Sequence, residues 1–152
     1  MLDLSTKSAY ATRAVYELSR AWNKGIGKLT LKEIVEKQDV PSDYMEKLLF
    51  KLKRMGIVKT IRGKNGGYAL NKPPNEIRIS DIVLALENPI KRLNCLHASK
   101  SKRCDAFESC AIKYVWQEAY NAMIESFSKY TFQDLVEMES KMTLKRHESD
   151  AL

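Results

Sequence analysis

Three thiols lie close together in the second half of the chain, and their type and spacing indicate a specific chemistry. Cys95, Cys104 and Cys110 are the only cysteines, and all three fall within 16 residues. The segment that holds most of them, from Ile90 to about Phe107, has no clear period and is predicted to be an irregular loop. An odd number of cysteines argues against a disulfide scaffold. Thiolates gathered on one loop are typical ligands of a soft metal ion or an iron–sulfur cluster.

The identity of a fourth ligand separates the possible metal sites. An iron–sulfur cluster usually takes four protein ligands, so one position is left open by three cysteines. His97, Asp105 and Glu108 are nearby candidates, and a residue of a second subunit is another. The cysteines together with His97 would alternatively form a Cys₃His zinc site, although neither gap has the two-residue spacing of structural zinc knuckles. Three free thiols without a metal are the remaining interpretation.

Positive charge is the second feature with a functional meaning. The formal net charge is +7, and it is unevenly placed. Residues 1–80 contain 16 Lys and Arg against 8 Asp and Glu, whereas residues 81–152 contain 10 against 11. The first part therefore has a net charge of +8 and the second a net charge of −1. Asymmetry of this kind indicates a surface that binds nucleic acid.

Residues 41–71 combine this charge with a helix and a hairpin. The apolar residues of the predicted helix recur at the helical period; they are Met45, Leu48, Leu49, Leu52 and Met55. Gly56 ends the helix, and two β-rich runs, 57–62 and 68–70, flank the glycine-rich turn 63–67. A basic helix followed by a basic hairpin predicts a winged helix-turn-helix. The helix would enter a major groove, and the hairpin tip would reach a minor groove or the backbone.

Side chains of this helix and hairpin are the candidates for contact with DNA. Glu46 can accept from a cytosine amino group and Lys47 can donate to guanine, while Ser42 is expected to cap the helix. The planar guanidinium of Arg62 suits a narrow minor groove. Phosphate contact or plain solvation is the alternative for each. The predicted DNA-binding residues are Lys7, Ser42, Tyr44, Glu46, Lys47, Lys51, Arg62, Lys64 and Asn65.

Other helices must position this unit. A first helix is predicted from Thr6 to Trp22, capped by Ser5 or Thr6. Its buried stripe is formed by Ala11, Ala14, Val15, Leu18 and Trp22. Thr30 and Glu33 have the spacing of a capping box, which opens a short helix that ends at about Gln38. After the hairpin we expect a rigid spacer at 72–75 and a helix from Asp81 to about Leu86, capped by Ser80.

A long helix from Ala111 to Ser128 is predicted to pair two copies of the chain. Its apolar stripe is Ile112, Trp116, Ala119, Met123 and Phe127. Val115, Tyr120 and Ile124 widen this surface beyond what a small domain can cover, which favours a homodimer. Thr131 is expected to cap a last helix that ends at about Met142. The predicted units are 1–80 for DNA binding, 81–110 for a connecting helix and the cysteine loop, 111–142 for dimerisation, and 143–152 as a flexible tail.

Several classes of function find little support in the sequence. No run of apolar residues is long enough to span a membrane, and the N-terminus has no apolar stretch typical of a signal peptide, so we expect a cytoplasmic protein. There is no Cys-x-x-Cys pair, no phosphate-binding glycine loop after a strand, and no paired acid–base cluster. A thiol redox enzyme is therefore a weaker interpretation than a regulator, and we expect no enzyme activity.

The sequence resembles the Rrf2 (Rrf-two) family of bacterial winged-helix repressors, in its IscR, NsrR and CymR group. The matching motifs are Leu4–Lys7 with Tyr10, the segment from Tyr44 to Leu48, and Arg62-Gly63 with Gly66-Gly67-Tyr68 in the wing. The order of helices from Ala11 to about Met138 also matches. The resemblance implies a homodimer that binds partly palindromic operators in double-stranded DNA and pairs through the long helix.

The resemblance also implies a cofactor. Members with three cysteines in this loop carry an iron–sulfur cluster, so Cys95, Cys104 and Cys110 would be its ligands, with [2Fe–2S] preferred to [4Fe–4S] and zinc as the alternative. The cluster would sense redox state, iron or nitric oxide. Lys113 and Ala9 stand where some members have the fourth ligand, and the first gap between cysteines is longer than usual. A metal-free regulator of the same fold that responds to a thiol signal or a small ligand is the alternative function.

Overall fold

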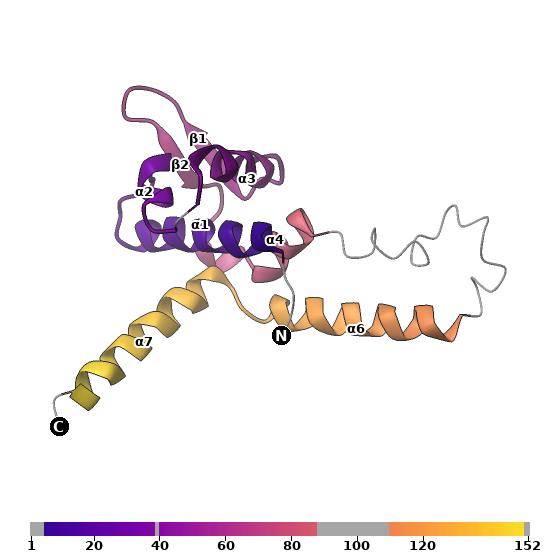
Figure 1. The fold of residues 1–152 in the computed structure, drawn as a ribbon. Coiled ribbons are helices and arrows are strands. Elements are labelled where there is room, and N and C mark those ends of the chain that lie inside the picture. The colour runs from indigo at the N-terminus through magenta and orange to yellow at the C-terminus, as the bar shows by residue number, and fades with distance from the viewer. Residues whose placement is uncertain (1–4, 39, 88–109, 151–152) are drawn as a thin grey trace.

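The computed structural model describes residues 5–38, 40–87 and 110–150, and it confirms a mainly α fold with a small β-hairpin (Figure 1). The N-terminal part contains α1 (Thr6–Asn23), α2 (Leu31–Val35), α3 (Ser42–Arg54), β1 (Val58–Ile61), β2 (Gly67–Leu70), the 3₁₀ helix η1 (Pro74–Glu76) and α4 (Ile79–Leu86). Two long helices, α6 (Ala111–Ser128) and α7 (Phe132–Asp150), complete it. No helix in these described parts is long and apolar enough to cross a membrane.

Helix α1 lies at the centre of the core, where it contacts α3, α4, β2 and α7. Its small residues Ala11 and Ala14 are fully buried, which lets the neighbouring helices approach closely, and Met45, Leu49 and Leu52 of α3 are buried in the same cluster. Two residues predicted to be buried are not. Trp22 is 40% exposed in the last turn of α1, and Met55 is 57% exposed just after the last residue of α3. Both residues fit the apolar spacing of their helix, but they lie at its C-terminal end, beyond the part that packs against the core.

The loop before α2 pairs with the hairpin through a short extended segment at Leu29. β1 and β2 pair antiparallel with Val58 opposite Leu70, and Leu29 exchanges two backbone hydrogen bonds with Tyr68, at 2.9 and 2.8 Å. This approach explains a wing glycine, because a Cβ on Gly67 would lie 2.4 Å from the carbonyl oxygen of Leu29. The root of the wing is thus fixed to the body of the domain.

Two predicted helix caps and one predicted spacer differ from the structure. Ser42 begins α3 as expected, but Pro41 occupies its N-cap position and no side chain caps it. α4 starts at Ile79, two residues earlier than predicted, and Ser80 is buried inside it. The Asp81 carboxylate caps this start by accepting the Arg78 backbone N–H at 2.8 Å. The spacer predicted at 72–75 gives way to η1 from Pro74 onward. The capping box of Thr30 and Glu33 is confirmed.

The junction between α6 and α7 is anchored next to α4. Phe132 is fully buried and its backbone N–H donates to Ile77 at 2.9 Å, while the Ile79 N–H donates to Tyr130 at 3.1 Å. Thr131 and Asp134 form a reciprocal cap, which confirms Thr131 as the start signal of α7. α7 is longer than predicted and continues to Asp150, so residues 143–150 belong to a helix and not to a frayed tail. From this anchor α6 and α7 diverge (Figure 1).

Candidate nucleic-acid interface

Helix α3 buries one face and presents the other to solvent. Met45, Leu48, Leu49 and Leu52 are buried. Of the residues predicted to contact DNA, Ser42, Glu46, Lys47 and Lys51 are exposed, whereas Tyr44 is half-buried. The last turn adds Lys53 and Arg54, which also oppose the negative end of the helix dipole. The exposed face therefore carries a mixture of hydrogen-bond donors and acceptors of the kind that can read base edges.

One aromatic contact and one electrostatic interaction link this helix to its surroundings. The rings of Tyr44 and Tyr10 meet edge to face, with centroids 6.3 Å apart, so Tyr44 has a packing role beside any contact with DNA. Burial and the negative charge of Glu46 on α3 both raise the pKa of Tyr68 in the wing, so Tyr68 lies close to α3. Helix and wing thus lie side by side as one surface.

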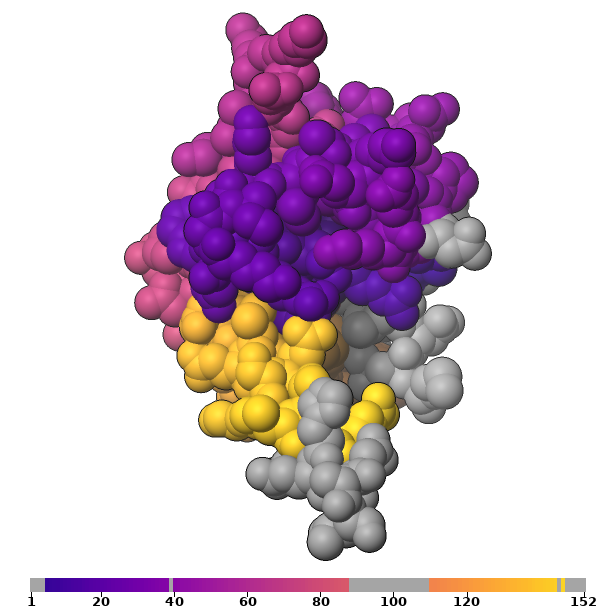
Figure 2. Space-filling view, turned by 90° about the vertical axis from the view of Figure 1, so that its left-hand side faces the viewer, coloured from indigo at the N-terminus to yellow at the C-terminus, as the bar shows by residue number. Residues whose placement is uncertain are grey.

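The tip of the wing projects from the molecule as a narrow lobe (Figure 2). Arg62, Lys64 and Asn65 are all exposed there, as a contact with DNA requires. The Nζ of Lys28, from the loop after α1, donates to the backbone carbonyl of Asn65 and braces the tip. Sequence reasoning missed Lys28, since its partner lies 37 residues further along the chain.

The N-terminus of α1 holds a carboxylate. Glu87, the last described residue before the gap, accepts hydrogen bonds from the Ser5 backbone N–H at 3.2 Å, the Ser8 hydroxyl at 2.8 Å and the Ser5 hydroxyl. Burial raises the pKa of Glu87, but these bonds and the nearby charge of Lys7 outweigh it, so the pKa lies below its ordinary value. Ser5 is thus the N-cap residue, although its hydroxyl binds Glu87 and not its own helix. Lys7 is half-buried beside this cluster.

Only one of the predicted metal ligands falls in the described part of the chain. Cys110 is a free, half-buried thiol at the N-cap position of α6. Cys95, Cys104, His97, Asp105 and Glu108 lie outside the described residues. Within the described residues, no group of three metal-binding side chains is found. The donor chemistry of three thiols fits a soft metal or an iron–sulfur cluster.

The apolar stripe of α6 is largely exposed among the residues that the structure describes. No residue of α6 is buried. Ile112 is 67% and Trp116 is 49% exposed, and Ala119 is also exposed, while Met123 and Phe127 are half-buried nearer the anchor. Tyr114 and Val115 add to this apolar surface.

One further candidate was not singled out from the sequence. Phe50 lies on α3 and is 59% exposed among charged neighbours, a position from which an aromatic ring can contact a thymine methyl group. It falls outside the stripe of Met45, Leu49 and Leu52, and that offset is the signal that could have found it.

A short helix pair followed by a two-stranded wing defines a winged helix-turn-helix protein, a DNA-binding class. Residues 4–138 match the model of the Rrf2 family, described as iron-dependent transcriptional regulators. The chain therefore belongs to the Rrf2 family of transcription regulators.

Individual relatives agree with this assignment. The chain is 31% identical over 137 residues to an rrf2-like HTH-type transcriptional regulator of Rhodobacter capsulatus, covering 88% of this chain and 91% of that one. Among solved structures it is similar to IscR of T. potens, with a TM-score of 0.72, 30% identity, and coverage of 91% and 88%. It is also similar to CymR, the global cysteine regulator of B. subtilis, with a TM-score of 0.68, 30% identity, and coverage of 91% and 98%.

Proposed function

We propose that this protein is a homodimeric repressor of the bacterial cytoplasm that binds partly palindromic operators and senses a signal through its three cysteines. The observation that carries the DNA-binding part is the single exposed surface formed by α3 and the wing. Glu46, Lys47 and Lys51 lie on it, with Arg62 at the wing. α3 would read base edges in a major groove, and Arg62 would enter the adjacent minor groove.

Dimerisation follows from the uncovered stripe of α6. Exposed Ile112, Val115 and Trp116 make an apolar surface that the described residues of one copy leave in water, and a second α6 is the economical cover. Two reading heads held in this way would match two half-sites of a palindrome, so their separation would set operator spacing.

The sensing part rests on the donor set and on the family. Cys95, Cys104 and Cys110 would hold an iron–sulfur cluster, with [2Fe–2S] preferred, which supplies chemistry responsive to redox state, iron or nitric oxide. The family model's description as iron-dependent supports this proposal. The similarity to CymR keeps the alternative open: a metal-free or zinc-binding regulator of the same fold that responds to a thiol signal or a small ligand.

The DNA-binding proposal is tested by titrating labelled duplex DNA selected from a random pool, over a series of salt concentrations. Affinity should fall steeply with salt, as expected where several phosphates are neutralised. Arg62→Ala should weaken binding by about 1–3 kcal/mol, whereas Lys141→Ala, an exposed α7 control with the same loss of charge, should change it little. Equal affinities for Arg62→Ala and wild type would remove the wing from the mechanism.

A further inference from the structure

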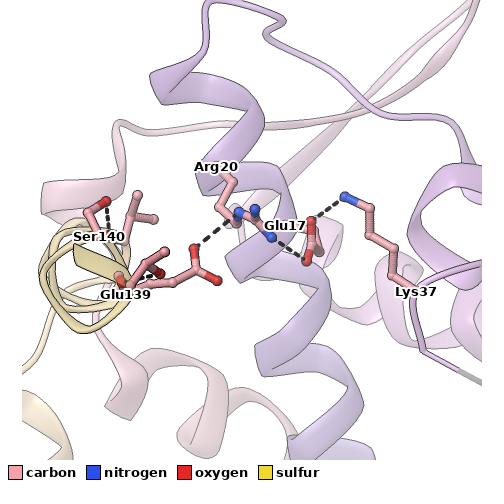
Figure 3. Close-up of polar contacts among 7 residues, drawn as sticks. Glu17, Arg20, Lys37, Glu139 and Ser140 are labelled. Carbon is pink, nitrogen blue, oxygen red and sulfur yellow. Dashed lines mark hydrogen bonds and ion pairs between the residues drawn. The ribbon is translucent and has the colours of Figure 1, made fainter. Parts of the chain in front are cut away.

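A chain of ion pairs crosses α1 and joins the turn after α2 to α7. Lys37, in the turn that leads into α3, pairs with Glu17 of α1 at 2.6 Å. The other oxygen of Glu17 faces the Arg20 guanidinium at 3.4 Å, and the Nε of Arg20 pairs with Glu139 of α7 at 3.3 Å. Figure 3 shows these four side chains in one line, from Lys37 on one side of α1 to Glu139 on the other.

Glu17 and Arg20 are the inner members of this chain and are screened from water. The Glu17 side chain is only 12% exposed and Arg20 is 33% exposed, whereas Lys37 and Glu139 are 50% and 44% exposed. A carboxylate with so little water around it depends on its two cationic neighbours, because an unpaired buried charge is costly. A displacement of Arg20 would therefore be felt by Lys37 through Glu17.

The two ends of the chain have different mechanical roles. The turn at Lys37 precedes the N-terminus of α3 by five residues, so its position helps to set how α3 is presented. Glu139 lies on α7 within the predicted dimerisation unit 111–142, where Met138 and Met142 are exposed, as is Leu144 just after it. Glu139 also accepts from the Tyr16 hydroxyl, and burial together with this carboxylate raises the pKa of Tyr16 to about 12. Two residues of α1, Arg20 and Tyr16, therefore hold the Glu139 carboxylate in place.

We propose that the chain Lys37–Glu17–Arg20–Glu139 is a positioning relay that links the placement of α7 to the orientation of the helix-turn-helix. The relay rests on the proposed DNA-binding function. A neutral contact also pins the same turn: the amide of the buried Gln38, oriented with its nitrogen toward α1, donates to the Tyr10 carbonyl at 3.2 Å. Gln38 holds the turn against α1. The ion pair of Lys37 with Glu17 makes the tilt of this turn depend on Arg20, and through Arg20 on α7.

A double-mutant cycle tests the relay. Lys37→Met, Glu139→Gln and the double variant are titrated with operator DNA at fixed salt. Lys37→Met should weaken binding by about 2–5-fold more than the control Lys32→Met, which removes an equal charge on α2 from an exposed pair with Glu36, the residue just after that helix. In the Glu139→Gln background the cost of Lys37→Met should fall by about half or more. Lys37→Arg should restore the wild-type behaviour.

Lys37 and Glu139 do not pair directly, so any coupling between them must pass through Glu17 and Arg20. If the effects of Lys37→Met and Glu139→Gln on DNA affinity simply add, the relay is refuted. It is also refuted if Lys32→Met is coupled to Glu139→Gln as strongly as Lys37→Met is. A second measurement is independent of DNA. Glu139→Gln should speed amide hydrogen exchange at residues 35–38, at the far side of α1, and Lys32→Met/Glu139→Gln should exchange there like Glu139→Gln alone. Unchanged exchange would also refute the relay. Failure of the wild type to bind any duplex would refute the DNA-binding proposal, while the exchange result would still decide on the relay.

Discussion

Tyr10 of α1 and Tyr44 of α3 meet edge to face, with ring centroids 6.3 Å apart and planes at 84°. Because Tyr44 is in the first turn of α3, this contact fixes the end of the helix that would enter DNA. An edge-to-face pair contributes about 0.5–1.5 kcal/mol beyond the area that it buries.

Tyr44→Leu should therefore lower the free energy of unfolding by about this amount, as measured by urea denaturation. Tyr44→Phe keeps the ring pair and should leave stability nearly unchanged. If Tyr44→Phe still weakens DNA binding, the hydroxyl contacts DNA, and the packing and DNA-binding roles are separated. A Tyr44→Leu variant as stable as wild type would show that the ring contact contributes nothing.

The wing glycine next to Leu29 should be intolerant of any side chain. A Cβ at Gly67 would lie 2.4 Å from the Leu29 carbonyl oxygen, so Gly67→Ala must separate β2 from that segment. We expect a loss of about 1–3 kcal/mol in unfolding free energy and weaker DNA binding. Lys64→Ala, at the exposed tip, should change stability by less than about 0.5 kcal/mol. Equal stabilities for the two variants would contradict the close approach.

Glu87 should make the fold sensitive to acid. Its folded-state pKa lies below its ordinary value, since the hydrogen bonds from Ser5 and Ser8 outweigh burial. The carboxylate therefore stabilises the fold above its ordinary pKa of 4.5, and this stabilisation is lost as pH falls through the lower folded value.

Glu87→Gln should accordingly be less stable than wild type at neutral pH, and the difference should shrink on acidification below about pH 4.5. Thermal unfolding measured between pH 7 and pH 3 checks this. Glu76→Gln, at an exposed position, serves as the control. A difference that stays constant across the whole range would show that the carboxylate charge is not what binds the two serines.

Trp116 tests the proposed dimer. A carboxylate at this position would be buried unpaired in an α6–α6 interface, so Trp116→Asp should shift sedimentation toward the monomer. Asn121→Asp adds the same charge to α6 outside the apolar stripe and should leave the sedimentation profile unchanged. A dimer that survives Trp116→Asp would place the pairing surface elsewhere.

Cys104 tests the proposed cofactor. An anaerobic preparation should absorb in the visible if an iron–sulfur cluster is bound, and Cys104→Ala should abolish that absorbance. His97→Ala shows whether this histidine is the fourth ligand, because only then would the spectrum change. A colourless wild type that contains zinc by elemental analysis would favour the Cys₃His site, and retained colour in Cys104→Ala would exclude Cys104 as a ligand.

Local patterns in the sequence predict much of this fold, because helical periods and capping boxes relate residues that are only three or four positions apart. The period of Met45, Leu48, Leu49 and Leu52 places α3 and its buried face, and Thr30 with Glu33 marks the start of α2. Within the described residues no side chain of α6 is buried, which agrees with the breadth of its apolar stripe, while its pairing with a second copy stays a prediction. Apart from half-buried Tyr44, the predicted DNA-binding residues on α3 and the wing are exposed, which agrees with their proposed role, and that role stays a prediction.

Contacts between distant residues could not be predicted. The bridge of Leu29 to Tyr68 and the pairing of Lys37 with Glu17 join positions that no short pattern relates. Trp22 fits the apolar period of α1, but only the end of the packed region decides that it is exposed. The length of α7 was missed since its polar last turns lack an apolar stripe, which is the signal on which such predictions depend.

The anchoring of α6 at one end has a mechanical consequence. At about 1.5 Å per residue, its 18 residues make an arm of roughly 27 Å between Ser128, held by the Arg78 guanidinium, and Cys110 at the opposite tip. A pivot of only about 10° at the fixed end would sweep that tip through about 5 Å, the length of one helical turn. A small force applied at the Cys110 end of α6 would therefore act through a long lever arm on the Ser128 end, where the helix joins the rest of the protein.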